Sequence, residues 1–224
     1  MSTDLPPVAA AIRSWWSPDA TLAYATPETA VWQGTQGLPL DEHAVIPANG
    51  TDLQLSDLAD VKRTLIVASR YRTSDFQAWL DKQFRYIAEL RSGEFGATLY
   101  GRVDHPLASV PVDAAWPSLR VTSLATWPQV KPGDPLPVDA ALEGQLDGTW
   151  KVSARLVDEA GTMLWQQDTS AVAENTSLTL FVPPSTPPGE YTLNFVVYNA
   201  ATQEVVADTA GRPATPLATI KVVE

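Results

Sequence analysis

The sequence predicts two domains of different fold class, an α/β domain over residues 1–110 and an all-β domain over residues 111–224. In the first part of the chain, short apolar runs alternate with amphipathic segments of helical spacing. In the last part, almost all segments are short apolar runs separated by turn residues. Between the two parts, Asp104–Ser118 is rich in proline and small residues, which is typical of a linker.

Four segments of the first part have the pattern of strands. Thr64–Ser69, TLIVAS, is a nearly continuous apolar run, as expected for a central parallel strand that is covered on both faces. Thr21–Ala25 and His43–Pro47 are shorter runs of the same kind. Arg85–Val103 has two strand-like runs around a Ser-Gly turn, which predicts an antiparallel pair at the edge of a mainly parallel sheet.

The segments between these strands have helical spacing. In Thr73–Phe84 the aromatic and leucine side chains recur at i, i+3, i+4 and i+8, so they share one helix face. The other segments with helical or helix-start signals are Val8–Trp16, Thr26–Thr35 and Thr51–Val61. Strands that alternate with helices at this spacing predict a small Rossmann-like α/β domain of three layers.

The last part of the chain is expected to contain short strands only. Turn signals such as KPGD, DEAG and YNAATQ separate them. This spacing predicts an antiparallel β-sandwich of the immunoglobulin or fibronectin-III type. The predicted strands are Leu119–Trp127, Leu136–Glu143, Trp150–Asp158, Met163–Gln167, Ser177–Val182, Gly189–Tyr198, Glu204–Asp208 and Thr215–Val223.

A proline-rich turn precedes the clearest of these strands. Prolines cannot donate to a sheet ladder, so Pro183–Pro188 is expected to lie outside the sheet. In Tyr191–Tyr198 the side chains alternate, and the face that begins with Tyr191 is expected to point into the core. The Tyr191 hydroxyl is then placed to form a corner hydrogen bond to the turn.

Composition excludes several classes of function. The net charge of −11 argues against a broad surface for nucleic acid or for anionic membranes. The chain has no cysteine and two histidines, which leaves little for metal sites or for acid–base chemistry that needs several histidines. No apolar run approaches the ~20 residues of a membrane span. The turn after Thr21–Ala25 lacks the glycines of a dinucleotide site, so no cofactor is predicted.

No catalytic residue is predicted. Neighbouring residues on a strand point to opposite faces, so adjacent acidic pairs do not converge on one substrate atom, and solvated turns are the expected place for them. Each histidine is expected to have a structural or exposed role, and no Gly-x-Ser-x-Gly motif is present. The residues concerned are Asp41, Glu42, Asp158, Glu159, His43 and His105.

The eight tryptophans are the most unusual feature of the composition. An indole ring can stack on the C–H face of a sugar, and nearby amides and carboxylates can bind its hydroxyl groups. The predicted ligand-binding residues, for a glycan, are Trp165, Gln167 and Asp168. The alternative is packing between domains, because Trp116 and Trp127 flank the predicted boundary.

The motifs of the chain also resemble a known family. KPGDPLPVDAALEG, WKVSARLVDEAGTMLWQQDT and LTLFVPPSTPPGEYTLNFVVYNAATQEVV are similar to a β-sandwich module, and KRTLIVASRYRTSDFQAWLDKQF is similar to a small α/β domain. Both resemble the C-terminal extracytoplasmic region of bacterial membrane glycosyltransferases that are similar to dolichyl-phosphate-mannose protein mannosyltransferases. In that family the catalytic acids lie in the membrane-embedded part, so the resemblance implies no catalytic residue here.

The resemblance implies a non-catalytic, extracytoplasmic accessory region that binds a glycan, an acceptor or a cell-surface protein. It also implies a membrane tether through a segment that these residues do not contain. The alternative is a structural or adhesive cell-surface module with no ligand of its own. A third reading, an independent hydrolase, needs a pocket in which two acids meet His43 or His105.

Overall fold

The computed structural model describes residues 5–24, 45–47, 61, 63–69, 80–144, 148–171 and 175–224, and most of them lie in β-strands that form several sheets. The chain divides into two compact units. Unit 1 comprises residues 1–104 and 133–135, and unit 2 comprises residues 105–132 and 136–224. The sequence placed the division between residues 110 and 111.

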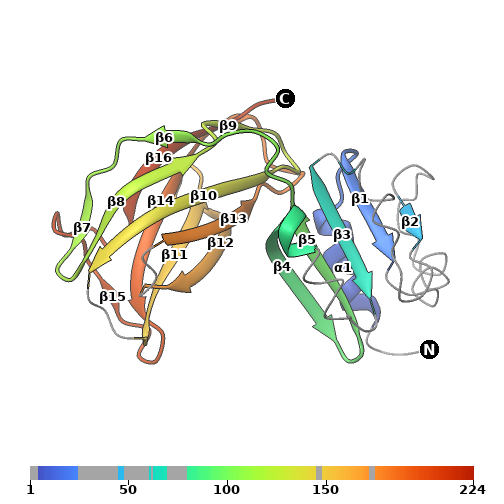
Figure 1. Cartoon of the computed structure of the whole chain (residues 1–224), viewed down its shortest axis with the longest axis horizontal. Helices are drawn as coiled ribbons and strands as arrows, with labels where there is room; N and C mark the ends of the chain where they lie inside the picture. Colours follow the sequence, from blue (N-terminus) through green and yellow to red (C-terminus); the bar gives the residue numbers. More distant parts are fainter. Residues whose placement is uncertain are drawn as a thin grey trace. The chain divides into compact units, whose positions relative to one another are not determined.

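Unit 1 contains a five-stranded sheet in the order β2-β1-β3-β5-β4 (Figure 1). Strand β1 pairs in parallel with β2 and β3, whereas β5 pairs antiparallel with β3 and β4. The expected parallel strands and antiparallel edge are therefore both present. The strand bounds are β1 (Ala20–Tyr24), β2 (Val45–Pro47), β3 (Thr64–Ser69), β4 (Arg85–Ser92) and β5 (Phe95–Gly101).

Helix α1 (Leu5–Trp15) packs against β4 and β5. Pro6 and Pro7 lie in its first turn, where the missing backbone N–H groups cost no intrahelical bond. Val8, Ile12 and Trp15 follow at helical spacing and are buried, so this face of the helix joins the core of the unit.

The other predicted helices fall largely outside the described residues. This applies to Thr26–Thr35, to Thr51–Val61 except its last residue, and to Thr73–Phe84 before residue 80. Residues 80–83 are helical, and both Leu80 and Phe84 are buried in a cluster with residues of β1, β3 and β5. The three-layer arrangement therefore stays a prediction.

Residues 133–135 belong to unit 1, although the chain on both sides of them belongs to unit 2. The hydroxyl of Thr64, on β3, donates to the carbonyl oxygen of Gly133 (3.2 Å). Arg63 Nη1 and the buried Asp134 Oδ2 form an ion pair at 2.5 Å. A β-carbon built at Gly101 would lie 2.4 Å from Pro135 Cβ. Only glycine therefore lets the end of β5 lie this close to Pro135.

Unit 2 contains two sheets (Figure 1). One has the order β13-β10-β8-β6, with β7 also paired to β8, and the other has the order β12-β11-β14-β16-β9, with β15 also paired to β14. The strands of the first sheet are β6 (Ala108–Val110), β7 (Ala114–Trp116), β8 (Leu119–Thr126), β10 (Pro135–Gly144) and β13 (Asn175–Phe181). Those of the second are β9 (Gln129–Val130), β11 (Trp150–Val157), β12 (Met163–Ser170), β14 (Gly189–Asn199), β15 (Val205–Val206) and β16 (Thr215–Val222).

The predicted linker Asp104–Ser118 is not simply a linker, because it contains β6 and β7, and both pair with β8. Its prolines, at positions 106, 111 and 117, lie outside the two short strands. A proline interrupts a sheet ladder, but short strands can form between two prolines. A proline-rich composition therefore did not indicate β6 and β7.

Trp116 and Trp127 both belong to unit 2, and both are buried.

The prediction for β14 is confirmed in two respects. Tyr191, Leu193, Phe195 and Val197 are buried, as expected for the face that points into the core. The hydroxyl of Tyr191 donates to the carbonyl oxygen of Pro187 at 2.8 Å, which is the expected corner bond. Val196, on the other face of the strand, is also buried, and that was not expected.

Candidate functional site

The candidate site lies on the face of β11, β12 and β14 that points away from the core. On β11 the side chains of Val152, Ala154 and Leu156 are buried on the core face, so Ser153 and Arg155 belong to the opposite face. Residues directly opposite each other in a ladder share a face. Ser153 pairs with Asp168, Arg155 pairs with Gln166 and Asn194, and Lys151 pairs with Tyr198.

These three strands, together with the turn that follows β14, surround a concavity of about 180 Å³. We call it the outer-face concavity. Ser153 and Val196 are buried on the same face of these strands, although they point away from the core. The residues that line the concavity are Arg155, Gln166, Asp168, Tyr198, Gln203 and Val205.

Arg155 is held by one hydrogen bond and keeps its terminal nitrogens available. Its Nε donates to Ser153 Oγ at 3.1 Å, which also satisfies the buried serine hydroxyl. Among the described residues, Nη1 and Nη2 of Arg155 have no hydrogen-bond or ion-pair partner. The guanidinium can therefore donate two parallel hydrogen bonds to a ligand.

Asp168 and Tyr198 form the acidic side of the concavity. The Tyr198 hydroxyl donates to Asp168 Oδ2 at 3.0 Å, which leaves Oδ1 open within the described part of the chain. Partial burial, the hydrogen bond to Asp168 and the negative charge of Asp168 together raise the pKa of Tyr198, whereas the charge of Arg155 opposes this rise. The tyrosine thus stays protonated and remains a donor at neutral pH.

A tightly bonded turn supplies Gln203 and Val205. Asn199 Oδ1 accepts hydrogen bonds from the backbone N–H groups of Ala201 (2.9 Å) and Thr202 (3.1 Å), and the carbonyl oxygen of Asn199 accepts from the N–H of Gln203 (2.8 Å). Gln203 has a φ of 61°, in the left-handed region that non-glycine residues rarely adopt. Among the described residues other than glycine, it alone has a positive φ.

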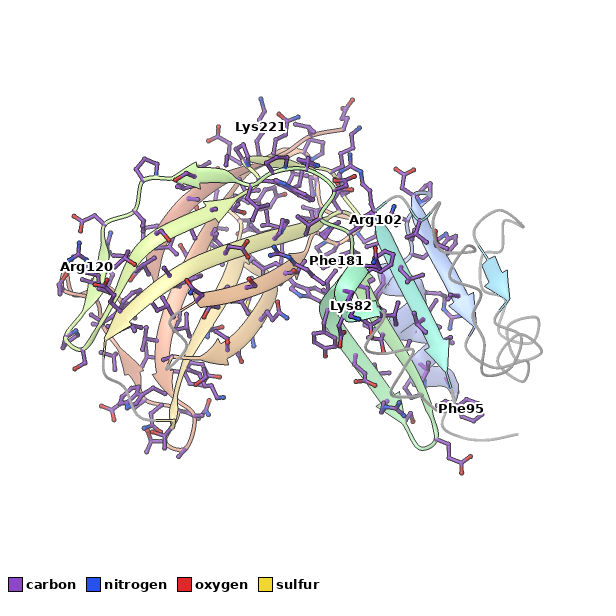
Figure 2. The ribbon with its side chains drawn as sticks, viewed as in Figure 1. Lys82, Phe95, Arg102, Arg120, Phe181 and Lys221 are labelled. Atoms are coloured by element: carbon purple, nitrogen blue, oxygen red, sulfur yellow. The ribbon has the colours of Figure 1, made fainter. Side chains whose placement is uncertain are left out.

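The predicted glycan residues do not come together. Trp165 and Gln167 lie on the core face of β12, because they pair with Leu156 and Ala154. The Trp165 ring packs edge-on against Phe181 of β13 at 5.4 Å between centroids (Phe181 is labelled in Figure 2), and Gln167 Oε1 accepts from the N–H of Thr179 at 2.6 Å. Asp168 alone lines the outer-face concavity.

The sequence reasoning missed Arg155, Tyr198 and Gln203. A signal for Arg155 was present, because the DEAG turn predicts a hairpin of Trp150–Asp158 with Met163–Gln167. Pairing these strands places Arg155 opposite Gln166, on the same face as Asp168. Nothing in the sequence indicates that the turn after β14 lies against this face.

The other candidate residues have structural surroundings where they are described. Asp158 Oδ1 accepts from the N–H of Thr162 (2.7 Å) within a turn, and Glu159 is exposed. The ring of His105 stacks on Trp127 at 4.0 Å, and the indole N–H of Trp127 donates to the carbonyl oxygen of His105 at 3.4 Å. Asp41, Glu42 and His43 lie outside the described residues.

The described residues lack two further kinds of feature. They contain no group of three or more His, Cys, Asp or Glu side chains arranged to hold a metal ion. Within the same residues, no helix is both long enough and apolar enough to span a membrane.

The comparisons with known proteins identify no family. No protein-family model matches the chain, and no curated protein matches it. One solved structure with some likeness is the endonuclease/exonuclease/phosphatase from Beutenbergia cavernae DSM 12333, with 14% sequence identity and a TM-score of 0.33. The match covers 72% of this chain and 57% of that one, so this chain spans little more than half the length of that protein. At this TM-score the likeness carries no argument about function.

The outer-face concavity offers several kinds of hydrogen-bonding group. It combines one guanidinium, one carboxylate, one phenol and two primary amides with the apolar side chain of Val205. A polar cavity with a small apolar wall suits a small ligand that offers both hydrogen-bonding groups and C–H surface.

Proposed function

We propose that the chain is a non-catalytic, extracytoplasmic accessory region of a membrane glycosyltransferase-like protein, and that unit 2 binds a glycan through the outer-face concavity. The observation that carries the binding part is that Arg155 and Asp168 line one small cavity without forming an ion pair with each other. The accessory role is supported by the motif resemblance alone. The parent protein would then be tethered to the membrane through a segment beyond these residues.

The finer fold assignments belong to the same proposal. An immunoglobulin or fibronectin-III type of sandwich in unit 2 is supported by its two mainly antiparallel sheets and by the corner bond of Tyr191. A Rossmann-like three-layer domain in unit 1 is supported by the parallel order β2-β1-β3.

A titration followed by amide chemical shifts tests the binding proposal. Isotope-labelled protein is titrated with a panel of neutral and acidic oligosaccharides. We expect shifts that saturate at the amides of Arg155, Asp168, Tyr198 and Gln203. No saturating shift with any oligosaccharide of the panel would contradict glycan binding and would favour the structural or adhesive module.

A charge-matched pair of variants serves as a control. Asp168→Asn removes the carboxylate of the outer-face concavity, whereas Glu159→Gln removes an exposed carboxylate from the turn between β11 and β12. We expect binding to weaken in Asp168→Asn and to persist in Glu159→Gln. Equal weakening in both variants would indicate a general charge effect instead of a defined site.

The accessory role has a separate test. The reading frame that encodes this chain is expected to encode several membrane-spanning helices before residue 1. Tandem sandwich domains behind a signal peptide would instead favour the structural or adhesive module.

A further inference from the structure

We propose that the outer-face concavity selects an uncharged saccharide and holds two neighbouring hydroxyl groups of one ring. One hydroxyl donates to Asp168, and its neighbour accepts from Arg155. This inference rests on the proposed glycan binding and narrows it to a class of ligand.

The site contains two charged groups of opposite sign. Arg155 and Asp168 are diagonal neighbours across the β11–β12 ladder, because Arg155 is opposite Gln166 and Ser153 is opposite Asp168. They do not form an ion pair with each other. The terminal nitrogens of Arg155 and the Oδ1 atom of Asp168 can therefore both form hydrogen bonds to a ligand in the concavity. Such a ligand must accept hydrogen bonds from Arg155 and donate one to Asp168.

A ligand that carries a single charge can pair with only one of these two residues. A carboxylate or phosphate would pair with Arg155, but it has no proton to donate to Asp168 and would be repelled by it. An ammonium group would pair with Asp168 and be repelled by Arg155. Hydroxyl groups both donate and accept, so two adjacent hydroxyls satisfy both residues.

The other side chains that line the concavity are apolar, aromatic or amide groups. Val205 is 44% exposed, which is unusual for a large apolar residue in the part of the chain that the structure describes, and it is directly opposite Tyr198 in the β14–β15 ladder. The C–H face of a pyranose can cover both side chains. The amides of Gln166 and Gln203 can bond further hydroxyls of the same ring.

A peptide also donates and accepts, but the position of the site disfavours it. Peptides that bind sheets commonly add a strand along an exposed edge. The outer-face concavity lies over a sheet face, and two of its strands, β11 and β14, are paired on both sides. A cavity of about 180 Å³ also suits one ring better than an extended chain.

The site is ordered before any ligand arrives. Ser153 fixes the guanidinium of Arg155 through Nε, Tyr198 fixes Asp168 through Oδ2, and the Asn199 turn fixes Gln203. Groups that are already positioned lose little conformational freedom on binding.

The experiment uses the full chain and methyl pyranosides of the gluco, manno and galacto series, with binding followed by amide shifts at Arg155, Gln166 and Asp168. For the sugar that binds most tightly, the matched probes are its monodeoxy derivatives and the uronic acid of the same series. We expect removal of either hydroxyl of one adjacent pair to weaken binding about tenfold or more, because each is bound to a charged group. The uronate is expected to bind more weakly than the neutral sugar.

Variants identify the two residues. Arg155→Gln and Asp168→Asn are each expected to weaken binding about tenfold or more, whereas Arg120→Gln, an exposed arginine on β8 (labelled in Figure 2), is expected to leave it unchanged. If Arg155→Gln fails to fold, the deoxy sugars on the unaltered protein still test the inference.

The outcomes separate this inference from the proposed function. If the uronate binds more tightly than the neutral sugar, or if no single deoxy derivative binds more weakly than the parent sugar, the present inference is wrong. Either result leaves the proposed glycan binding intact. No binding by any saccharide overturns both. Saturating shifts at the same amides with an unstructured peptide, and none with saccharides, would also overturn both.

Discussion

At the residue scale, Asp208 is a buried carboxylate that connects the loop after β15 to β16. Its side chain is 1% exposed. It accepts hydrogen bonds from the backbone N–H groups of Ala210 (3.0 Å) and Arg212 (2.8 Å), from Arg212 Nε (2.7 Å) and from the Thr215 hydroxyl (3.0 Å). Burial alone raises the pKa of Asp208, but these hydrogen bonds outweigh it and lower the pKa from 3.8 to about 2.

This lowered pKa predicts a dependence of stability on acid pH. The folded state holds the Asp208 proton less tightly than the unfolded state, so the contribution to stability is complete above pH ~4 and is lost as the pH falls toward about 2. Asp208→Asn is expected to be less stable at neutral pH and to show a shallower loss of stability between pH 4 and pH 2. Urea unfolding at a series of pH values measures both. Parallel curves for the two proteins over this range would contradict the prediction.

Gln203 has a strained backbone conformation, and the cost of this strain in stability can be measured. The left-handed conformation costs a side chain about 1–2 kcal/mol, and glycine avoids most of this cost while losing more entropy on folding. The side chain also donates from Nε2 to the carbonyl oxygen of Ala200 at 2.8 Å, a bond that both Gln203→Gly and Gln203→Ala remove. Gln203→Gly is therefore expected to have a free energy of unfolding about 0.5–1 kcal/mol above that of Gln203→Ala. Both variants are expected to weaken saccharide binding, because the amide is lost. Gln203→Asn is the matched control, since asparagine tolerates this conformation and keeps an amide. A glycine variant that is no more stable than Gln203→Ala would contradict the strain.

At the element scale, the sequence predicts a strand well when the pattern of apolar residues within that strand reflects how it is buried. Residues 64–68 of TLIVAS are buried, as predicted for a strand that is covered on both faces, although β3 pairs in parallel only with β1 and antiparallel with β5. In YTLNFVVY the face predicted to point into the core is buried, but Val196 on the other face is buried as well. The site could not be predicted in the same way. Trp165, Gln167 and Asp168 are neighbours in sequence, but strand alternation places the third on the opposite face from the first two.

The pairing between strands, and not the pattern within one strand, assembles the outer-face concavity. Arg155, Asp168 and Tyr198 come from β11, β12 and β14, and their registers depend on two separate connections. The alternation within Tyr191–Tyr198 predicted which face points into the core, but it did not indicate that Ser153 and Val196, on the outer face, are buried. Contacts of this kind depend on tertiary structure, so a pattern within a single segment does not contain them.

The corner bond of β14 gives a prediction for this element. Tyr191→Phe removes the hydroxyl that donates to Pro187, so it is expected to lower the free energy of unfolding by about 1 kcal/mol. Tyr198→Phe is the matched control in the same strand, because its hydroxyl bonds to the exposed Asp168, and we expect a loss below about 0.5 kcal/mol. Denaturant unfolding compares the two variants. An equal loss in both would mean that the corner bond has no special weight.

At the scale of the whole molecule, each of the two units contains buried apolar side chains of its own. In unit 1 the core is formed by side chains of β1, β3, β5 and residues 80–84, and in unit 2 it is formed by the inner faces of two sheets. Units with their own cores can open at different free energies. The effect of a substitution is then expected to stay within the unit to which its contacts belong.

The ion pair of Arg63 and Asp134 tests this independence, because both residues belong to unit 1 although they are 71 positions apart. Arg63→Met keeps the aliphatic stem and removes a charge partner of a buried carboxylate, so it is expected to destabilise unit 1 by about 1–3 kcal/mol. Hydrogen exchange resolves where the loss occurs: amides of β3 and β5 are expected to exchange faster, while amides of β11 and β14 keep their rates. Equal acceleration in all four strands would mean that the units unfold together, and the division of the chain into two independently stable cores would then be wrong.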